Sequence, residues 1–387
     1  MKIEPFELER LQSIWENRVE INLTESGIHP YSLRELLRDE EIEELLDVRL
    51  GYGWTDGEPE LRRLVSELYA DTGPENVLVS CGSAEANFLA MWTLLEPQDQ
   101  IAVMLPNYMQ IWGIAKSLGV EVRGFHLRED LDWAPDLDEL RSIVTPRTRL
   151  IAVCNPNNPT GAVLSRDAME EILEIAASVG ATVYADEVYK GVELDGREGP
   201  SFRDLDSSAI VASGLSKALA HPGLRIGWLA GPADFIDAAW HRNDYTTITT
   251  SVVSEHVART ILHPDRRREI LARNREMLNQ NLATLVDWTR QRPGQFHFVP
   301  PKAGGMCFLR YTQQINSTEL ATWLRTEKSL LVLPGDVYGM DQYLRLGIGE
   351  RSDYLARGLE RLGSGLDELG QRAKEATGTA DIADIAE

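Results

Sequence analysis

An alternation of short apolar segments with longer amphipathic segments dominates the middle of this sequence and constrains its fold more than any other feature. Short apolar segments bounded by turn residues are typical of buried strands, and amphipathic segments between them are typical of helices. The expected strands are 77–81, 101–105, 121–126, 150–154, 182–185, 209–213 and 226–230. The clearest helices between them are 85–95, 110–118 and 167–179. This order predicts βαβ units, and so an α/β fold with a mostly parallel seven-stranded sheet flanked by helices.

The pattern changes after Gly231-Pro232 and predicts a second, smaller α+β unit. A long Arg-rich segment, 234–290, is typical of helix. Beyond it we expect strands at 296–300, 306–311, 330–333 and 343–347, and helices at 317–327 and 354–369. The expected domains are 1–46 (N-terminal arm and part of the small domain), 47–286 (large domain) and 287–369 (small C-terminal domain). Residues 370–387 are small and acidic without an apolar face, so we expect a disordered tail.

Composition narrows the class of protein. Hydrophobic residues make up 43% and charged residues 26% of 387 residues, as in globular proteins. A net charge of -22 predicts a surface that repels nucleic acids and anionic membranes. We find no apolar stretch long enough to span a membrane and no secretory signal. Three cysteines lie too far apart for a disulfide framework or a zinc site, so we expect a cytoplasmic protein without a metal.

Short polar segments follow several of the predicted strands. In parallel sheets, ligands bind beyond the carboxyl ends of the strands, which is where these segments lie. Residues 155–161 read NPNNPTG, a rigid turn whose Asn side chains offer hydrogen-bond donors and acceptors. Asp186 and Tyr189 follow strand 182–185. An acid at such a position either caps a helix or pairs with a protonated nitrogen of a ligand.

A third string, SGLSK at 213–217, ends in Lys217 and is followed by Arg225 between glycines. Hydroxyls together with an Arg suit a phosphate, and a lysine beside it could form a Schiff base with an aldehyde. The ordinary alternative is a solvated surface lysine. Segment 80–85, SCGSAE, predicts a turn into a helix, whose first N–H groups suit an anion.

These motifs together resemble the class I/II aminotransferase family, the fold type I enzymes of pyridoxal 5′-phosphate (PLP). The resemblance runs from about residue 22 to residue 369. It implies a large PLP-binding domain, a homodimer with shared active sites, and conversion of an α-amino acid through an external aldimine and a quinonoid. It implies that Lys217 carries the cofactor and then moves the Cα proton. Asp186 would pair with the ring nitrogen, and Tyr189 and Asn158 would hydrogen-bond the phenolic oxygen.

The same resemblance assigns the remaining contacts. Tyr108 would stack on the ring, and Tyr52 would reach the phosphate bound by the neighbouring subunit. The phosphate would be held by Gly82, Ser83, Ala84, Ser216 and Arg225. The substrate would be bound by Gly27, Asn158 and Arg345, with Arg345 on its α-carboxylate.

One position departs from the family pattern. The family often has a hydroxyl three residues before the lysine, where this chain has Gly214. Ser213 or Ser216 must therefore substitute for it.

The N-terminal string ESGIH at 25–29 is similar to the start of capreomycidine synthases and related guanidine cyclases. Those enzymes act on hydroxylated arginine, eliminate water and close a ring. The likeness implies that His29 shuttles a proton to the leaving hydroxyl, and that Glu9 or Glu25 pairs with a guanidinium. The alternatives are a structural His and two exposed charges.

Aminotransfer is the activity expected first, and dehydrating cyclisation of a hydroxylated arginine is the alternative. A non-catalytic binding module of the same fold is a remote third reading. The sequence leaves the side-chain specificity and the amino acceptor open.

Overall fold

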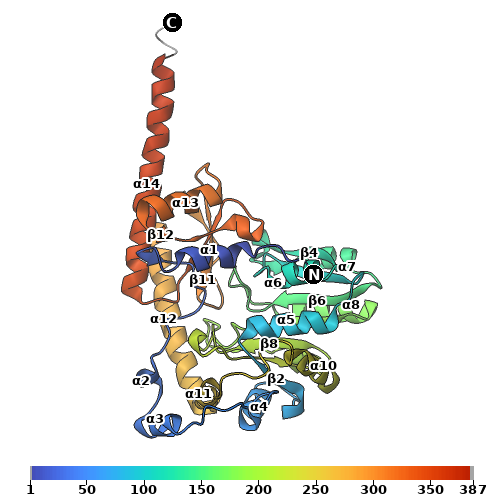
Figure 1. The fold of residues 1–387 in the computed structure, drawn as a ribbon. Coiled ribbons are helices and arrows are strands. Elements are labelled where there is room, and N and C mark those ends of the chain that lie inside the picture. Colours follow the sequence, from blue (N-terminus) through green and yellow to red (C-terminus); the bar gives the residue numbers. More distant parts are fainter. Residues whose placement is uncertain (1, 384–387) are drawn as a thin grey trace.

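The computed structural model describes residues 2–383, which form a large domain, a small domain and an N-terminal segment that contacts both (Figure 1). The large domain is built on an eight-stranded sheet with the order β2-β9-β8-β7-β6-β3-β4-β5. Its strands are β2 (Val77–Ser80), β3 (Gln100–Leu105), β4 (Glu121–Arg128), β5 (Ala134–Pro135), β6 (Thr148–Cys154), β7 (Thr182–Asp186), β8 (Ile210–Gly214) and β9 (Gly227–Ala230).

The mostly parallel sheet confirms the predicted fold class. Strands β4, β3, β6, β7 and β8 pair in parallel, and β9 runs antiparallel to both of its neighbours. The seven predicted strands are all present, and the eighth is the two-residue strand β5, which pairs with β4. The carboxyl ends of the parallel strands therefore meet at one edge, where the polar strings of the sequence emerge.

Helices cover both faces of this sheet. Alternate residues of β6 belong to two separate apolar clusters, with Leu150 on one face and Ile151 on the other. The Leu150 face packs against α5 (Ser83–Leu94), α6 (Gln110–Ser117) and α10 (Ala233–Asn243). The opposite face packs against α7 (Leu137–Ile143) and α8 (Arg166–Val179), among others. Burial on both faces explains why these strands read as continuous apolar runs.

The small domain contains a four-stranded antiparallel sheet with the order β10-β11-β14-β13. Its strands are β10 (Phe296–His297), β11 (Met306–Tyr311), β13 (Leu333–Pro334) and β14 (Tyr343–Gly347). Near the chain start, β1 (Ile21–Asn22) pairs in parallel with β12 (Leu330–Leu331). The N-terminal segment is therefore tied to the small domain.

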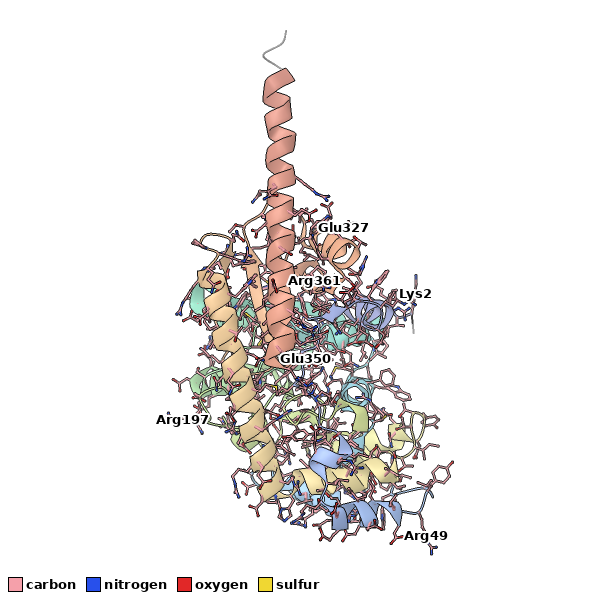
Figure 2. All side chains as sticks on the ribbon, turned by 90° about the vertical axis from the view of Figure 1, so that its left-hand side faces the viewer. Lys2, Arg49, Arg197, Glu327, Glu350 and Arg361 are labelled. Atoms are coloured by element: carbon pink, nitrogen blue, oxygen red, sulfur yellow. The ribbon has the colours of Figure 1, made fainter. Side chains whose placement is uncertain are left out.

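Two long helices join and extend the domains. Helix α12 (Pro264–Arg290) runs from the large domain toward the small one, and the predicted boundary at 286/287 falls inside it. Helix α14 (Ser352–Ala383) packs along α12 and projects beyond the small domain (Figures 1 and 2). The tail predicted to be disordered from residue 370 overlaps the last part of this helix, which extends to Ala383. Residues 384–387 lie outside the described residues.

The remaining helices are short. They are α1 (Glu7–Trp15), α2 (Leu33–Leu36), α3 (Asp39–Leu46), α4 (Pro59–Ser66), α9 (Phe202–Leu205), α11 (Val252–Leu262) and α13 (Ser317–Lys328). Between residues 2 and 383, no helix has the length and apolar character that crossing a membrane requires.

Candidate active site

A cavity of about 400 Å³ lies where the carboxyl ends of the large-domain strands meet the small domain and α1. This volume lies within the range of small-molecule and cofactor sites. Residues that follow β2, β6, β7 and β8 line it, together with Arg345 from β14 and Phe6, Glu9 and Gln12 from the N-terminal segment. Most of the residues predicted from the strand-end motifs therefore converge on one cavity.

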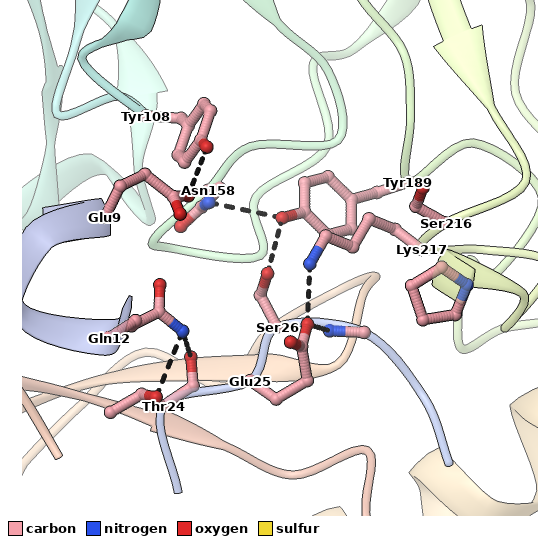
Figure 3. A network of polar contacts seen from close by, with 12 residues as sticks. Glu9, Gln12, Thr24, Glu25, Ser26, Tyr108, Asn158, Tyr189, Ser216 and Lys217 are labelled. Carbon is pink, nitrogen blue, oxygen red and sulfur yellow. Dashed lines mark hydrogen bonds and ion pairs between the residues drawn. The ribbon is translucent and has the colours of Figure 1, made fainter. Parts of the chain in front are cut away.

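Lys217 enters this cavity from the loop after β8 (Figure 3). The backbone N–H of the next residue, Ala218, donates to the carbonyl of Val188 at 3.2 Å, which fixes the loop against the segment after β7. The Lys217 Nζ donates to Glu25 Oε1 at 2.6 Å. The sequence predicted the lysine but not this partner.

Asp186 lies at the end of β7 and is 6% exposed. Its Oδ2 accepts a hydrogen bond from Asn87 Nδ2 at 3.1 Å, and its Oδ1 accepts one from the Val188 N–H at 3.2 Å. Burial raises the pKa of the Asp186 carboxyl, while these hydrogen bonds and the Lys217 charge oppose that rise. A cationic ring nitrogen would supply the charge partner that a buried carboxylate needs.

Asn87 is a site residue that sequence reasoning missed. It lies on α5 and is almost fully buried, and it also accepts a hydrogen bond from the Tyr184 hydroxyl at 2.5 Å. An Asn among the apolar residues of α5 was the available signal, because a buried amide requires hydrogen-bond partners.

Tyr189 and Asn158 form a buried pair beside the lysine. Asn158 Nδ2 donates to the Tyr189 hydroxyl at 3.2 Å, and Ser26 Oγ lies 2.9 Å from the same hydroxyl. Arg345 Nη1 donates to Asn158 Oδ1 at 2.9 Å, so the amide is oriented from both ends. Burial raises the pKa of Tyr189, which keeps the phenol protonated and able to donate.

Residues predicted to hold a phosphate lie together at the start of α5. Gly82 has φ of +79°, a conformation that side-chain-bearing residues rarely adopt, and it turns the chain so that the N–H groups of Ser83 and Ala84 begin the helix. Ser83, Ala84 and Arg225 all line the cavity, and the Arg225 guanidinium lies against Gly82. A helix N-terminus facing a guanidinium is a suitable site for a phosphate.

The departure at Gly214 has a steric cause. A side chain at this position would come within 2.9 Å of the carbonyl of Ile226, the residue before the adjacent strand β9. Of the two serines offered as substitutes, Ser216 lines the cavity and accepts a hydrogen bond from Arg225 Nη1 at 3.5 Å. Ser213 instead donates to the Glu187 carbonyl at 3.3 Å and lies outside the cavity lining.

Helix α1 supplies one wall of the cavity. Glu9 accepts a hydrogen bond from the Tyr108 hydroxyl, and the ring of Phe6 lies 5.0 Å from that of Tyr108. Gln12 Nε2 donates to the Thr24 carbonyl at 3.1 Å. Sequence reasoning weighed Glu9 as an exposed charge or a guanidinium partner, and it missed Phe6 and Gln12. The amphipathic pattern of α1 was the only signal for them.

Three residues predicted to belong to the site are not among those that line the cavity. Gly27 donates its N–H to Glu25 Oε1 at 2.7 Å and so lies next to Lys217. His29 does not line the cavity, because its Nδ1 lies 2.9 Å from Glu350 Oε2 and its N–H donates to the Gly349 carbonyl. This position does not favour the catalytic role predicted for His29. Tyr52 is 89% exposed and is also absent from this cavity.

The groups that converge here fit PLP. The lysine amine can react with the PLP aldehyde, and the buried carboxylate can pair with the ring nitrogen. The phenol and amide pair can hydrogen-bond the phenolic oxygen. The helix N-terminus and the arginine can bind the phosphate. Within residues 2–383, no group of three His, Cys, Asp or Glu residues is placed to hold a metal ion.

Comparison with known proteins agrees with this geometry. Residues 25–362 match the family described as aminotransferase class I and II. Capreomycidine synthase from Streptomyces vinaceus is 30% identical over 91% of this chain and 90% of its own length. A PLP-dependent aminotransferase structure from Streptococcus suis 89-1591 covers 95% of this chain and 99% of its own at 34% identity, with a TM-score of 0.90. The PLP-dependent cyclase OrfR covers 95% and 98% at 26% identity, with a TM-score of 0.88.

Proposed function

Because this chain belongs to the class I and II aminotransferase family, we propose that it converts a free amino acid whose side chain carries a guanidinium group. The chain is a PLP-dependent enzyme of that family, a transaminase or a cyclase. The observation that carries the substrate proposal is the Glu9 carboxylate in the cavity wall.

The charges that line the cavity support a cationic side chain. Of the lining residues, the cations are Lys217, Arg225 and Arg345, and each already has a role in holding the cofactor or the α-carboxylate. No lining cation remains for an acidic side chain. Of the lining acids, Asp186 is buried at the end of β7, which leaves Glu9 on α1 as the carboxylate available to a substrate. A carboxylate binds guanidinium through strong, charge-assisted hydrogen bonds.

Each residue of the site has a separate role in the proposed reaction. Bound PLP supplies an electron sink that makes the Cα–H bond of the substrate acidic. Arg345 binds the α-carboxylate and, through its bond to Asn158, ties the substrate to the Tyr189 pair. Lys217 Nζ takes the proton from Cα as general base. Asp186 keeps a protonated ring nitrogen paired with a negative charge.

The proposed reaction is dehydrating cyclisation of a hydroxylated arginine. Lys217 removes the Cα proton and delivers a proton to the β-hydroxyl, which leaves as water. A guanidine nitrogen then bonds to Cβ, and the proton that it loses returns to Cα. The products are a cyclic guanidino amino acid and water. The similarity to capreomycidine synthase over 91% of the chain supports this choice over simple aminotransfer.

Transamination is the second candidate. The Streptococcus suis structure, named as an aminotransferase, has the higher sequence identity of the two structural relatives compared above. Aminotransfer needs the same lysine, acid and arginines, but the proton removed from Cα is delivered to the cofactor instead of to a leaving group. The two reactions also differ in the group that leaves the substrate, since transamination would transfer the amino group and cyclisation would release the β-hydroxyl as water.

We also propose a homodimer with shared sites. Tyr52 is 89% exposed, and Leu50 and Trp54 beside it are 84% and 60% exposed. An exposed apolar group of this kind is typical of an interface. Tyr52 lies outside the cavity of its own chain, and this position supports the expectation that Tyr52 reaches the neighbouring subunit's cofactor.

A keto-acid-free turnover assay tests the reaction type. PLP-loaded protein is given arginine or hydroxyarginine, and product and the cofactor spectrum are followed together. Cyclisation predicts continued turnover of hydroxyarginine with the cofactor returned to its starting form. Product that stops at a single equivalent per subunit, with the cofactor left as its amine form, identifies a transaminase and refutes the cyclase proposal.

A further inference from the structure

Glu25 and Lys217 form an ion pair inside the candidate active site (Figure 3). The Lys217 Nζ lies 2.6 Å from Glu25 Oε1, and the same oxygen accepts the Gly27 N–H at 2.7 Å. The N–H of Gly27 therefore fixes the carboxylate oxygen that receives the lysine. Neither the family pattern used above nor the proposed chemistry assigns this contact a role.

The backbone around Glu25 is held tightly in place. The Gly347 N–H donates to the Leu23 carbonyl at 2.7 Å, and a side chain at Gly347 would come within 2.1 Å of the Glu25 carbonyl. Arg345 donates to the Thr24 carbonyl on one side, and Ser26 bonds Tyr189 on the other. This segment is thus anchored to both domains, so Glu25 presents a fixed carboxylate to a flexible lysine side chain.

The charges around Glu25 favour its ion pair with Lys217. Burial acts to raise the pKa of Glu25, but the Lys217 charge, the two hydrogen bonds and the more distant Arg345 lower it to about 2. These contacts therefore favour the ionised carboxylate. The other charged groups that face the pair are Arg345 from β14 and Asp186 from β7.

We propose that Glu25 is a positioning residue that directs the Lys217 amine into the cavity as an ammonium ion and so controls how it captures the cofactor aldehyde. In that capture the ammonium first releases a proton. The free amine then adds to the aldehyde carbon, a C=N bond forms, and the oxygen leaves as water. A fixed carboxylate opposes the proton release but keeps the nitrogen in place. The inference rests on Lys217 being the cofactor lysine in the proposed function.

The test measures PLP capture by the apo-protein, followed by absorbance over a range of pH, in wild type and Glu25→Gln. We expect the rate profile of Glu25→Gln to move to lower pH, with capture about tenfold faster on the acidic side, since the ammonium has lost its counter-charge. We also expect a lower rate on the basic plateau, because the amine is no longer held. Glu7→Gln, the same change at an exposed position of α1 outside the cavity lining, serves as the control and should leave both features unchanged.

An unchanged profile in Glu25→Gln, or the same change in Glu7→Gln, overturns the inference. Should Glu25→Gln not fold, Glu25→Asp is measured; its shorter carboxylate predicts a smaller shift in the same direction, and no shift overturns the inference. Borohydride reduction of the wild type followed by peptide mass spectrometry identifies the residue that carries the cofactor. This result separates failure of the inference from failure of the proposed function. Cofactor found on a residue other than Lys217 refutes the assignment of the lysine itself.

Discussion

The Glu9 carboxylate offers the sharpest test of substrate recognition, because Glu9→Gln removes its charge and keeps its shape. Glu9 is partly exposed on α1, and its carboxylate has lone pairs beyond the one used by the Tyr108 hydroxyl. A hydrogen bond to a charged group contributes about 1.5–3 kcal/mol, and partial exposure favours the low end. Loss of about 1.5 kcal/mol corresponds to roughly tenfold in Kd.

Arginine and citrulline make a matched pair for this assay, since citrulline replaces the guanidinium by a neutral ureido group of similar shape. The Kd of each amino acid is measured from the cofactor spectrum in wild type and Glu9→Gln. We expect the variant to lose about tenfold with arginine and to change little with citrulline. Glu7→Gln, an exposed change on the same helix, is the control. Equal losses for both amino acids, or no loss for arginine, would refute the reasoning.

Three further predictions follow from the geometry. Lys217→Ala should lower kcat by about 10²–10⁴ for every substrate while circular dichroism stays unchanged, because the general base is lost; retained turnover would contradict this. Leu50→Asp should halve the mass seen in sedimentation and weaken PLP binding if the exposed surface around Tyr52 is the dimer interface; an unchanged mass would count against that interface. Burial raises the pKa of the Glu187 carboxyl to about 7 from 4.5, so native protein holds a proton there that unfolded protein releases, and this contribution to stability is present below about pH 4.5 and is lost as pH rises through about 7. Glu187→Gln should therefore flatten the fall in melting temperature across that window, and an equal fall in both proteins would contradict the assignment.

Much of the large domain could be predicted because its strands carry an unusually clear signal. Residues such as Ile151 and Val153 face one apolar layer, and their neighbours Leu150 and Ala152 face the other. Strands buried on both faces therefore read as continuous apolar runs. The residues after these strands, including Asp186 and Lys217, could be predicted for the same reason, since the carboxyl ends of parallel strands converge.

Contacts between distant parts of the chain could not be predicted in this way. The pairing of Glu25 with Lys217 and of Glu9 with Tyr108 depends on how the N-terminal segment crosses the cavity, and no local pattern encodes that path. Strand β5 has only two residues, too few to show any periodicity. The sequence left His29 open between a proton shuttle and a structural residue, and only the structure shows its bond to Glu350.

The central claim is that a guanidinium-bearing amino acid is bound between Arg345 and Glu9. The most direct measurement is a crystal structure of PLP-loaded Lys217→Ala protein, which cannot move the Cα proton, soaked with arginine. The account predicts the α-carboxylate on Arg345 and the guanidinium within hydrogen-bond distance of the Glu9 carboxylate. A guanidinium directed to solvent or to another acid, with Glu9 still bonded only to Tyr108, would contradict it.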